Sequence, residues 1–213
     1  WVTRSQPVLL HVDSTGVGGA SNTGSSYGFY GVNGTSGHDI WAVGQYGQIY
    51  HNDSTGWTKF VDALGITPYD LEAVWAASTN FAVAVGQGGY ILKWNGSSWA
   101  QDTIIGGLTY RSVSGTGPSD VWAVGDGGTV VHYNGTAWSA VTSGTGQNLR
   151  GVWASSANEA YAVGDNKTVL MYNGSSWSPI SVQSSAPGTY YAISGVRGGQ
   201  ALIAGDRVLR GTR

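Results

Sequence analysis

Residues 120–138 read Asp-Val-Trp-Ala-Val-Gly-Asp-Gly-Gly-Thr-Val-Val-His-Tyr-Asn-Gly-Thr-Ala-Trp. Two short apolar runs flank the tight turn Asp126-Gly127-Gly128, and Asn134-Gly135 is a strong β-hairpin signal before Trp138. Variants of this unit recur along the chain, and each ends its Val-Gly-like run on an anchor glycine. The anchor glycines are Gly44, Gly86, Gly125, Gly164 and Gly205. Their spacings of 42, 39, 39 and 41 residues match a four-stranded propeller blade, whose repeat is about 40 residues long.

Four strand-like runs can be placed in each copy. The first run carries an aliphatic residue twelve positions before the anchor glycine: Val32, Val74, Val113, Val152 or Ile193. In the first four copies the fourth run begins at a tryptophan: Trp57, Trp99, Trp138 or Trp177. The sequence therefore predicts an all-β fold, a five-bladed β-propeller of four-stranded antiparallel blades with the first strand of each blade innermost. The predicted blades span 27–60, 69–102, 108–142, 148–182, and 189–213 together with 1–10.

The two ends of the chain look like parts of one blade. The last copy ends at residues 211–213, where its fourth strand would begin, and residues 1–8 are similar to 177–182 from Trp1 and Trp177 onward. We therefore expect residues 1 to about 10 to complete the last blade and close the ring, which would hide sheet edges. Residues 1–213 would then form a single domain, with 11–26 as a long loop. An open array of hairpins is the alternative architecture.

Composition excludes several classes of partner. Charged residues make up 10% of the chain, its formal net charge is −2, and Lys and Arg are scattered. We therefore expect no nucleic acid partner, because nucleic acids require clustered basic residues, and no membrane insertion, because no apolar run reaches 18 residues. Cysteine is absent, which excludes disulfides and thiolate metal sites. Abundant uncharged polar residues, and a start at Trp1, are typical of a mature or excised extracellular or cell-surface domain.

Candidate ligand-binding residues lie in two columns of the repeat, on the face where the innermost strands begin. This face also carries the long, variable connections between blades, where binding residues are usually found. The first column stands two residues before the inner-strand aliphatic and contains Tyr30, Glu72, Arg111, Arg150 and Tyr191. The second column follows the anchor glycine and contains Gln45, Gln87, Asp126, Asp165 and Asp206. Because Asp126 and Asp165 stand 15 residues after Arg111 and Arg150, we expect cross-strand pairs that form either a ligand site or a purely structural polar ring.

Aromatic residues are abundant, with 10 Trp and 12 Tyr. Such rings stack against pyranose sugars, although a tryptophan repeated in every blade is explained first by packing between sheets. Catalysis has little support, because glycosidases need a positioned pair of carboxylates and the inner strands carry only Glu72. The four histidines show no metal-ligand spacing. We expect no enzymatic activity, no metal and no cofactor.

The unit at 120–138 resembles the Trp-Ala-Val-Gly repeats of secreted bacterial β-propeller proteins, and the resemblance covers almost the whole chain. In layout the chain is also similar to propeller lectins, since Tyr172-Asn173-Gly174-Ser175-Ser176-Trp177 matches their Asp/Asn-Gly-Ser-x-Trp turn. The sugar ligands of those lectins cannot be transferred residue by residue, because the flanking positions differ. WD40 and kelch sequence signatures are absent.

Two function classes follow from these patterns. The first is a non-catalytic extracellular binding module, carbohydrate-binding or adhesive, with a glycan as its partner. The second is a structural or protein-interaction domain of a larger surface assembly, with a surface protein as its partner. The balance of aromatic and uncharged polar residues favours the first.

Overall fold

The computed structural model describes residues 8–13, 16–23, 25–53, 55–60, 69–182, 188–196, 200–206 and 209–210. Each of the first four repeats forms a four-stranded antiparallel sheet whose strands lie in chain order, so this part of the predicted fold is confirmed. Sheet 1 comprises β3 (Phe29–Ser36), β4 (Asp39–Gly44), β5 (Ile49–Asn52) and β6 (Trp57–Lys59). Sheet 2 comprises β7 (Leu71–Ser78), β8 (Phe81–Gly86), β9 (Tyr90–Trp94) and β10 (Trp99–Ile104).

The remaining repeats follow the same plan. Sheet 3 comprises β11 (Tyr110–Gly117), β12 (Asp120–Gly125), β13 (Val130–Tyr133) and β14 (Trp138–Val141). Sheet 4 comprises β15 (Leu149–Ser156), β16 (Glu159–Gly164), β17 (Val169–Tyr172) and β18 (Trp177–Pro179). Sheet 5 contains β19 (Tyr190–Gly195), β20 (Ala201–Gly205) and β21 (Leu209–Arg210). The second and third strands of sheets 1 to 4 are joined by the single 3-10 turns η1 (Gln45–Gly47), η3 (Gln87–Gly89), η4 (Asp126–Gly128) and η5 (Asp165–Lys167). Within the described ranges, no helix is long and apolar enough to cross a membrane.

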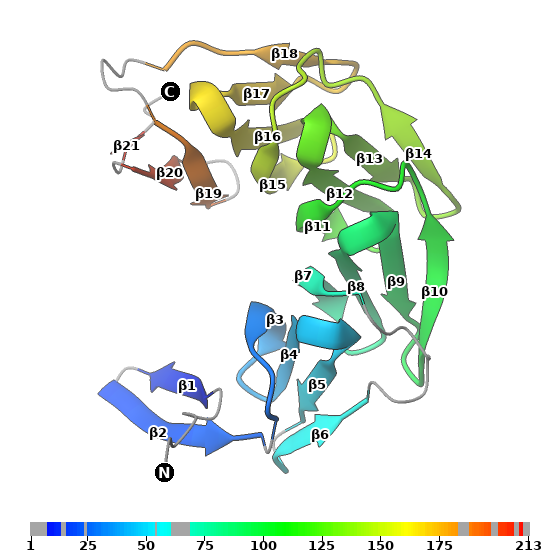
Figure 1. Cartoon of the computed structure of the whole chain (residues 1–213), viewed down its shortest axis with the longest axis vertical. Helices are drawn as coiled ribbons and strands as arrows, with labels where there is room; N and C mark the ends of the chain where they lie inside the picture. The colour runs from blue at the N-terminus through cyan, green and yellow to red at the C-terminus, as the bar shows by residue number, and fades with distance from the viewer. Residues whose placement is uncertain are drawn as a thin grey trace.

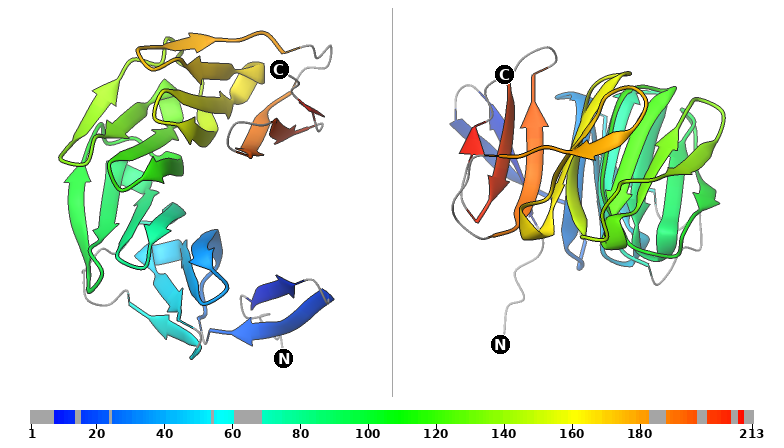
Figure 2. Two further views of the ribbon diagram at one scale, coloured as in Figure 1. Left: turned by 180° about the vertical axis from the view of Figure 1, so that it is seen from behind. Right: turned by 90° about the horizontal axis from the view of Figure 1, so that it is seen from above.

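The five sheets follow one another around an arc, with their first strands on the concave side (Figure 1). Each inner strand contacts the next one along the arc, from β3 to β7, β11, β15 and β19. Figure 2 shows the same arc from behind and from above, with sheet 1 and sheet 5 well apart along it. The arrangement is that of successive propeller blades.

Closure of the ring is not seen among the described residues. Residues 1–7, on which the similarity to the Trp177 strand rests, lie outside them. The next segment, β1 (Val8–Asp13), pairs with β2 (Gly16–Asn22) in a separate two-stranded sheet. Residues 8–10 therefore pair with β2 rather than with sheet 5, and the expectation of a loop over 11–26 is wrong for most of its length. Four of the seven residues in β2 are Gly or Ala, so it lacks the apolar–polar alternation that marks a strand in a sequence.

The anchor glycines are explained by a close approach between the first two strands of each sheet. A Cβ atom at Gly125 would lie 2.1 Å from the carbonyl oxygen of Thr109, and one at Gly164 would lie 2.0 Å from that of Asn148. The next residue uses this contact, since the N–H of Asp126 donates to the same Thr109 oxygen at 2.9 Å. Gly125 has an extended backbone with φ of −165°, so steric room, and not a special backbone conformation, requires glycine here.

The hydrophobic core is divided into four clusters, each between two neighbouring sheets. Trp41 and Trp122, at equivalent positions of β4 and β12, are fully buried in two of these clusters. The packing role predicted for the fourth-strand tryptophans is confirmed for Trp99 and Trp177, which are buried against Trp41 and Trp122 respectively. Sheet-to-sheet packing of aromatic rings therefore holds the arc together.

The two ends of the arc present faces that the other sheets bury. Val32 in β3 is 61% exposed, whereas the equivalent Val113 of β11 is buried beneath the preceding sheet. At the other end, Leu202 in β20 is 46% exposed, whereas the equivalent Trp122 is 1% exposed. Each end face is therefore built as half of a sheet-to-sheet contact that no sheet in the described part of the chain completes.

Candidate functional site

The concave side of the arc holds a cavity of about 640 Å³. All five inner strands contribute to its lining, so the cavity lies along the axis of the repeats. Among the lining residues are Tyr30, Asn33, Glu72, Trp75, Arg111 and Trp153. A half-exposed tyrosine, two partly buried indoles, one acid and one base thus face a single concave surface.

Five of the predicted site residues occupy one structural position, an irregularity in the inner strand. In β11 the pairing shifts between Tyr110 and Ser112, which leaves Arg111 as the extra residue. The same shift occurs around Tyr30, Glu72, Arg150 and Tyr191. A β-bulge redirects the side chain of its extra residue, and bulges are common beside binding sites. The column found in the sequence is therefore a column of redirected side chains.

The two predicted Arg–Asp pairs form as two-pronged ion pairs. Arg111 donates from Nε and Nη2 to the two carboxylate oxygens of Asp126, at 2.5 and 2.9 Å. Arg150 binds Asp165 through the same two groups, at 2.5 and 3.1 Å. The hydrogen bonds to Asp126 raise the pKa of Arg111, and the hydrogen bonds from Arg150 lower the pKa of Asp165. Both arginines are about one-third exposed, so they remain able to contact a ligand.

Glu72 lies in a different environment from the paired aspartates. Burial raises the pKa of Glu72, and the positive charge of Arg111 partly offsets this effect. Among the predicted site residues, Tyr30, Glu72 and Arg111 line the cavity together. The guanidinium of Arg150 lies over the ring of Tyr191, 5.6 Å from its centroid, so these two predicted residues form a second group farther along the arc. The arrangement supports a polar ligand floor beside Arg111 more than beside Arg150.

Four further surface residues on sheets 1 and 2 were not predicted from the sequence. Tyr27, Tyr46 and Tyr69 are exposed, and the backbone N–H of Tyr46 donates to Oδ1 of Asp70 at 2.9 Å. Tyr27 and Tyr69 lie in the connections that precede the inner strands, and no repeated column of the sequence marks them. Tyr46 carried a signal, because it occupies a turn position that holds Gly88 and Gly127 in other repeats.

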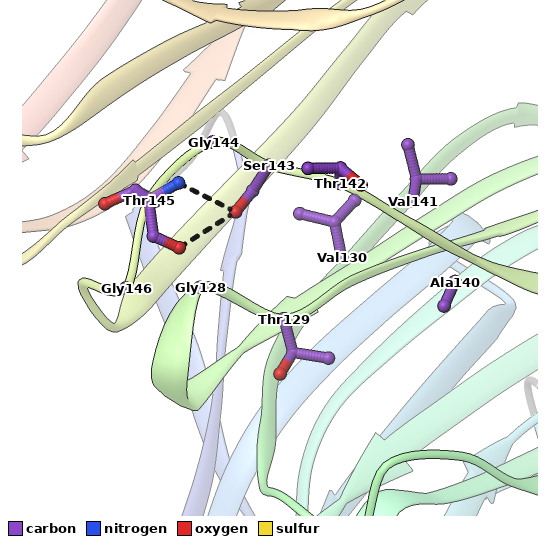
Figure 3. Close-up of a pocket in the computed structure, with 10 residues that line it drawn as sticks. All are labelled: Gly128, Thr129, Val130, Ala140, Val141, Thr142, Ser143, Gly144, Thr145 and Gly146. Carbon is purple, nitrogen blue, oxygen red and sulfur yellow. Dashed lines mark hydrogen bonds between the residues drawn. The ribbon is translucent and has the colours of Figure 1, made fainter.

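A second hollow, of about 450 Å³, lies beside η4 and the loop after β14 (Figure 3). Its nearest hydroxyl, that of Ser143, donates to the carbonyl of Thr145 and accepts from the N–H of the same residue, as the dashed lines show. Ser143 is buried, and its polar atoms hold the loop closed. This hollow therefore offers a ligand little beyond glycine backbone and short aliphatic side chains.

Two histidine–aspartate pairs occur, both within the packing between strands. His51 contacts Asp39 at 2.7 Å and stacks on Trp41, and His132 contacts Asp120 at 2.8 Å and stacks on Trp122. Burial alone would raise the pKa of Asp120, but hydrogen bonds from His132 and Thr116 hold it below its usual value. Among the described residues, no group of three His, Cys, Asp or Glu side chains could hold a metal ion.

No protein-family model matches the chain, and no curated protein matches it. Solved structures do. YCF48 from Cyanidioschyzon merolae superposes with a TM-score of 0.73 at 16% identity, over 96% of this chain and 76% of that one. U3-55K superposes with a TM-score of 0.73 at 10% identity, over 92% and 66%, and the WD40 repeats of RRP9 with 0.65 at 11%, over 82% and 59%. At these identities the likeness concerns the fold alone, and the chain has a β-propeller-like repeat fold.

Proposed function

We propose that this chain is a non-catalytic binding module whose ligand, a carbohydrate, occupies the cavity on the concave side of the arc. One observation carries the proposal: Tyr30, Glu72 and Arg111, three bulge residues from three successive sheets, line the same cavity. A half-exposed tyrosine offers a face on which a sugar ring can stack. Carboxylate and guanidinium groups bond sugar hydroxyls, and the indoles of Trp75 and Trp153 form part of the wall.

The low charge and uncharged polar composition support a location outside the cell or at its surface, in an adhesive role. A second candidate is a scaffold that binds a surface protein. The uncovered end faces around Val32 and Leu202 favour it, because exposed apolar faces of this kind mark interaction surfaces. A glycan array separates the two candidates. Binding to a restricted set of glycans supports the first, whereas no binding at millimolar sugar, together with a stoichiometric protein partner, supports the second.

Replacing Arg111 with alanine is expected to abolish glycan binding and to change stability little. Arg111 lines the cavity, and its partly exposed ion pair with Asp126 contributes about 0–1 kcal/mol. Arg150→Ala is the matched control, since it removes an equivalent ion pair that lies outside the cavity lining, and it is expected to weaken binding less. Array binding and melting temperature are measured for both. A loss of stability in Arg111→Ala with unchanged binding would show that the polar ring is structural.

The closed five-bladed ring, completed by residues 1 to about 10, remains part of this proposal. The similarity between the stretches that begin at Trp1 and Trp177 supports it, as do the two uncovered end faces, which could cover each other. Deletion of residues 1–6 is then expected to lower the melting temperature by several degrees, since an edge strand of sheet 5 would be lost. Replacing these residues with a Gly-Ser stretch of equal length is the control for chain length. An unchanged melting temperature in the deletion would contradict closure by this strand.

A further inference from the structure

Tyr46 is held in an unfavourable backbone conformation without the support of a buried side chain. Its φ is 56°, in the left-handed region, where the equivalent residues of the next two repeats are Gly88 and Gly127, and the fourth repeat has Asn166. Left-handed φ is unfavourable for a residue with a bulky side chain. The ring is 48% exposed, so core packing does not explain it. Strain of this kind, kept on a surface, points to a functional role for the side chain.

The ring of Tyr46 has a fixed aromatic neighbour. Tyr27 meets it edge to face, with 4.7 Å between the ring centroids. The loop that carries Tyr27 is pinned from below by the buried side chain of Gln48, whose Nε2 donates to the carbonyls of Tyr27 and Gly28 at 3.0 and 2.7 Å. Ser25, also buried, donates to Oε1 of Gln48 at 2.6 Å. Both tyrosines are therefore presented by rigid backbone before any partner arrives.

Sheet 2 extends this surface. The carboxylate of Asp70 accepts the N–H of Tyr46, which joins the two sheets at this point. Tyr69, the residue before Asp70, stacks on Tyr90 with 4.8 Å between the ring centroids and is itself exposed. We call Tyr27, Tyr46, Tyr69 and Asp70 the tyrosine patch.

The charge around the tyrosine patch is negative. Residues 25–53 and 69–92 contain no Lys or Arg, whereas they contribute Asp70 and Glu72 to this region. Exposed aromatic faces beside a carboxylate attract ammonium and guanidinium groups, through cation–π attraction and through charge. We propose that the tyrosine patch binds a lysine- or arginine-bearing segment of a protein partner. This surface is separate from the axial cavity, and the proposal does not depend on the glycan assignment.

The test uses the whole chain and a fluorescein-labelled nonapeptide of alternating lysine and glycine, with a serine–glycine peptide of equal length as the neutral probe. Fluorescence anisotropy is expected to show binding of the lysine peptide alone, weakened as NaCl rises from about 50 to 300 mM. Tyr46→Gly is expected to lower the affinity at least about tenfold without lowering the melting temperature, because it removes the ring and the strain together. Asp70→Asn, which keeps an acceptor for the Tyr46 N–H, is expected to reduce both the affinity and its dependence on salt.

Two control variants separate this role from general effects. Asn166→Gly makes the same backbone change in sheet 4, and Tyr191→Ala removes an exposed tyrosine at the far end of the arc. Both are expected to bind the lysine peptide like the unchanged chain. Equal binding of the two peptides, or full binding by Tyr46→Gly, would overturn the proposal. So would a neutral glycan whose binding requires Tyr46 while the lysine peptide does not bind.

Discussion

Replacing Trp122 with alanine is expected to lower the free energy of unfolding by about 3–5 kcal/mol, the usual loss for a fully buried large aromatic side chain. Trp122 is 1% exposed and lies at the centre of the contact between sheets 3 and 4. Its indole stacks on His132, with 4.0 Å between centroids, and meets Trp177 nearly perpendicularly at 5.2 Å. The substitution leaves a cavity between two sheets that the rigid strands on either side cannot fill.

Trp138→Ala is the matched control for this effect. It removes the same side chain from the outer strand β14, where the indole is only half-buried and donates from Nε1 to Asp102. We expect a clearly smaller loss, measured for both variants by urea unfolding followed by circular dichroism. Equal losses would mean that outer strands contribute as much to stability as the contacts between inner parts of the sheets. The structure indicates the opposite.

The repeat itself could be predicted because its signals are local. The glycine after each Val-Gly-like run and the Asn-Gly turn mark strand ends wherever they occur, and four complete sheets follow from them. The pairing of Arg111 with Asp126 was predictable for the same reason, since a fixed spacing of 15 residues across one hairpin sets two side chains side by side. The bulge that redirects Arg111 into the cavity was not predictable, because it depends on the approach of Gly125 to Thr109.

Alternation between neighbouring sheets also escaped the sequence argument. Sheets 2 and 4 carry an inner-strand tryptophan, and Trp75 packs over Gly115 of sheet 3, where a Cβ would lie 2.8 Å from the indole. At the intervening contacts a polar side chain bridges the strands instead, and the N–H of Ala154 donates to Ser114 at 3.1 Å. Two kinds of contact therefore alternate along the arc. An aligned column of Trp, Asn and Ser looks irregular when the repeats are treated as identical, and it becomes regular when they are taken in pairs.

The tyrosine patch shows a further limit of sequence reasoning. Tyr46 is unusual only when the backbone conformation of its turn is known, since a tyrosine after glutamine in a surface turn is unremarkable by composition. Tyr27 and Tyr69 lie in connections of different length, so no column brings them together. Contacts that the fold creates between two repeats, such as that of Tyr46 with Asp70, cannot be read from a period within one repeat.

Replacing Gly125 with alanine is expected to lower the free energy of unfolding by about 3 kcal/mol, at the upper end of the cost of overpacking. The added Cβ would lie 2.1 Å from the Thr109 oxygen and 2.9 Å from its carbonyl carbon, so backbone must move rather than a flexible side chain. That movement would also break the hydrogen bond from the Asp126 N–H to Thr109, which fixes the end of the hairpin bearing Arg111.

Gly117→Ala is the control for this prediction, since Gly117 lies in the same sheet and a Cβ there would meet nothing within 4 Å. It is expected to change the free energy of unfolding by less than about 0.5 kcal/mol. Urea unfolding of both variants measures stability, and glycan binding at subdenaturing conditions measures the site. If Gly125→Ala were as stable as Gly117→Ala, the repeated glycine would have a role other than steric room between strands. If it were unstable yet bound glycan normally when folded, the anchor glycines would support the sheet without positioning Arg111.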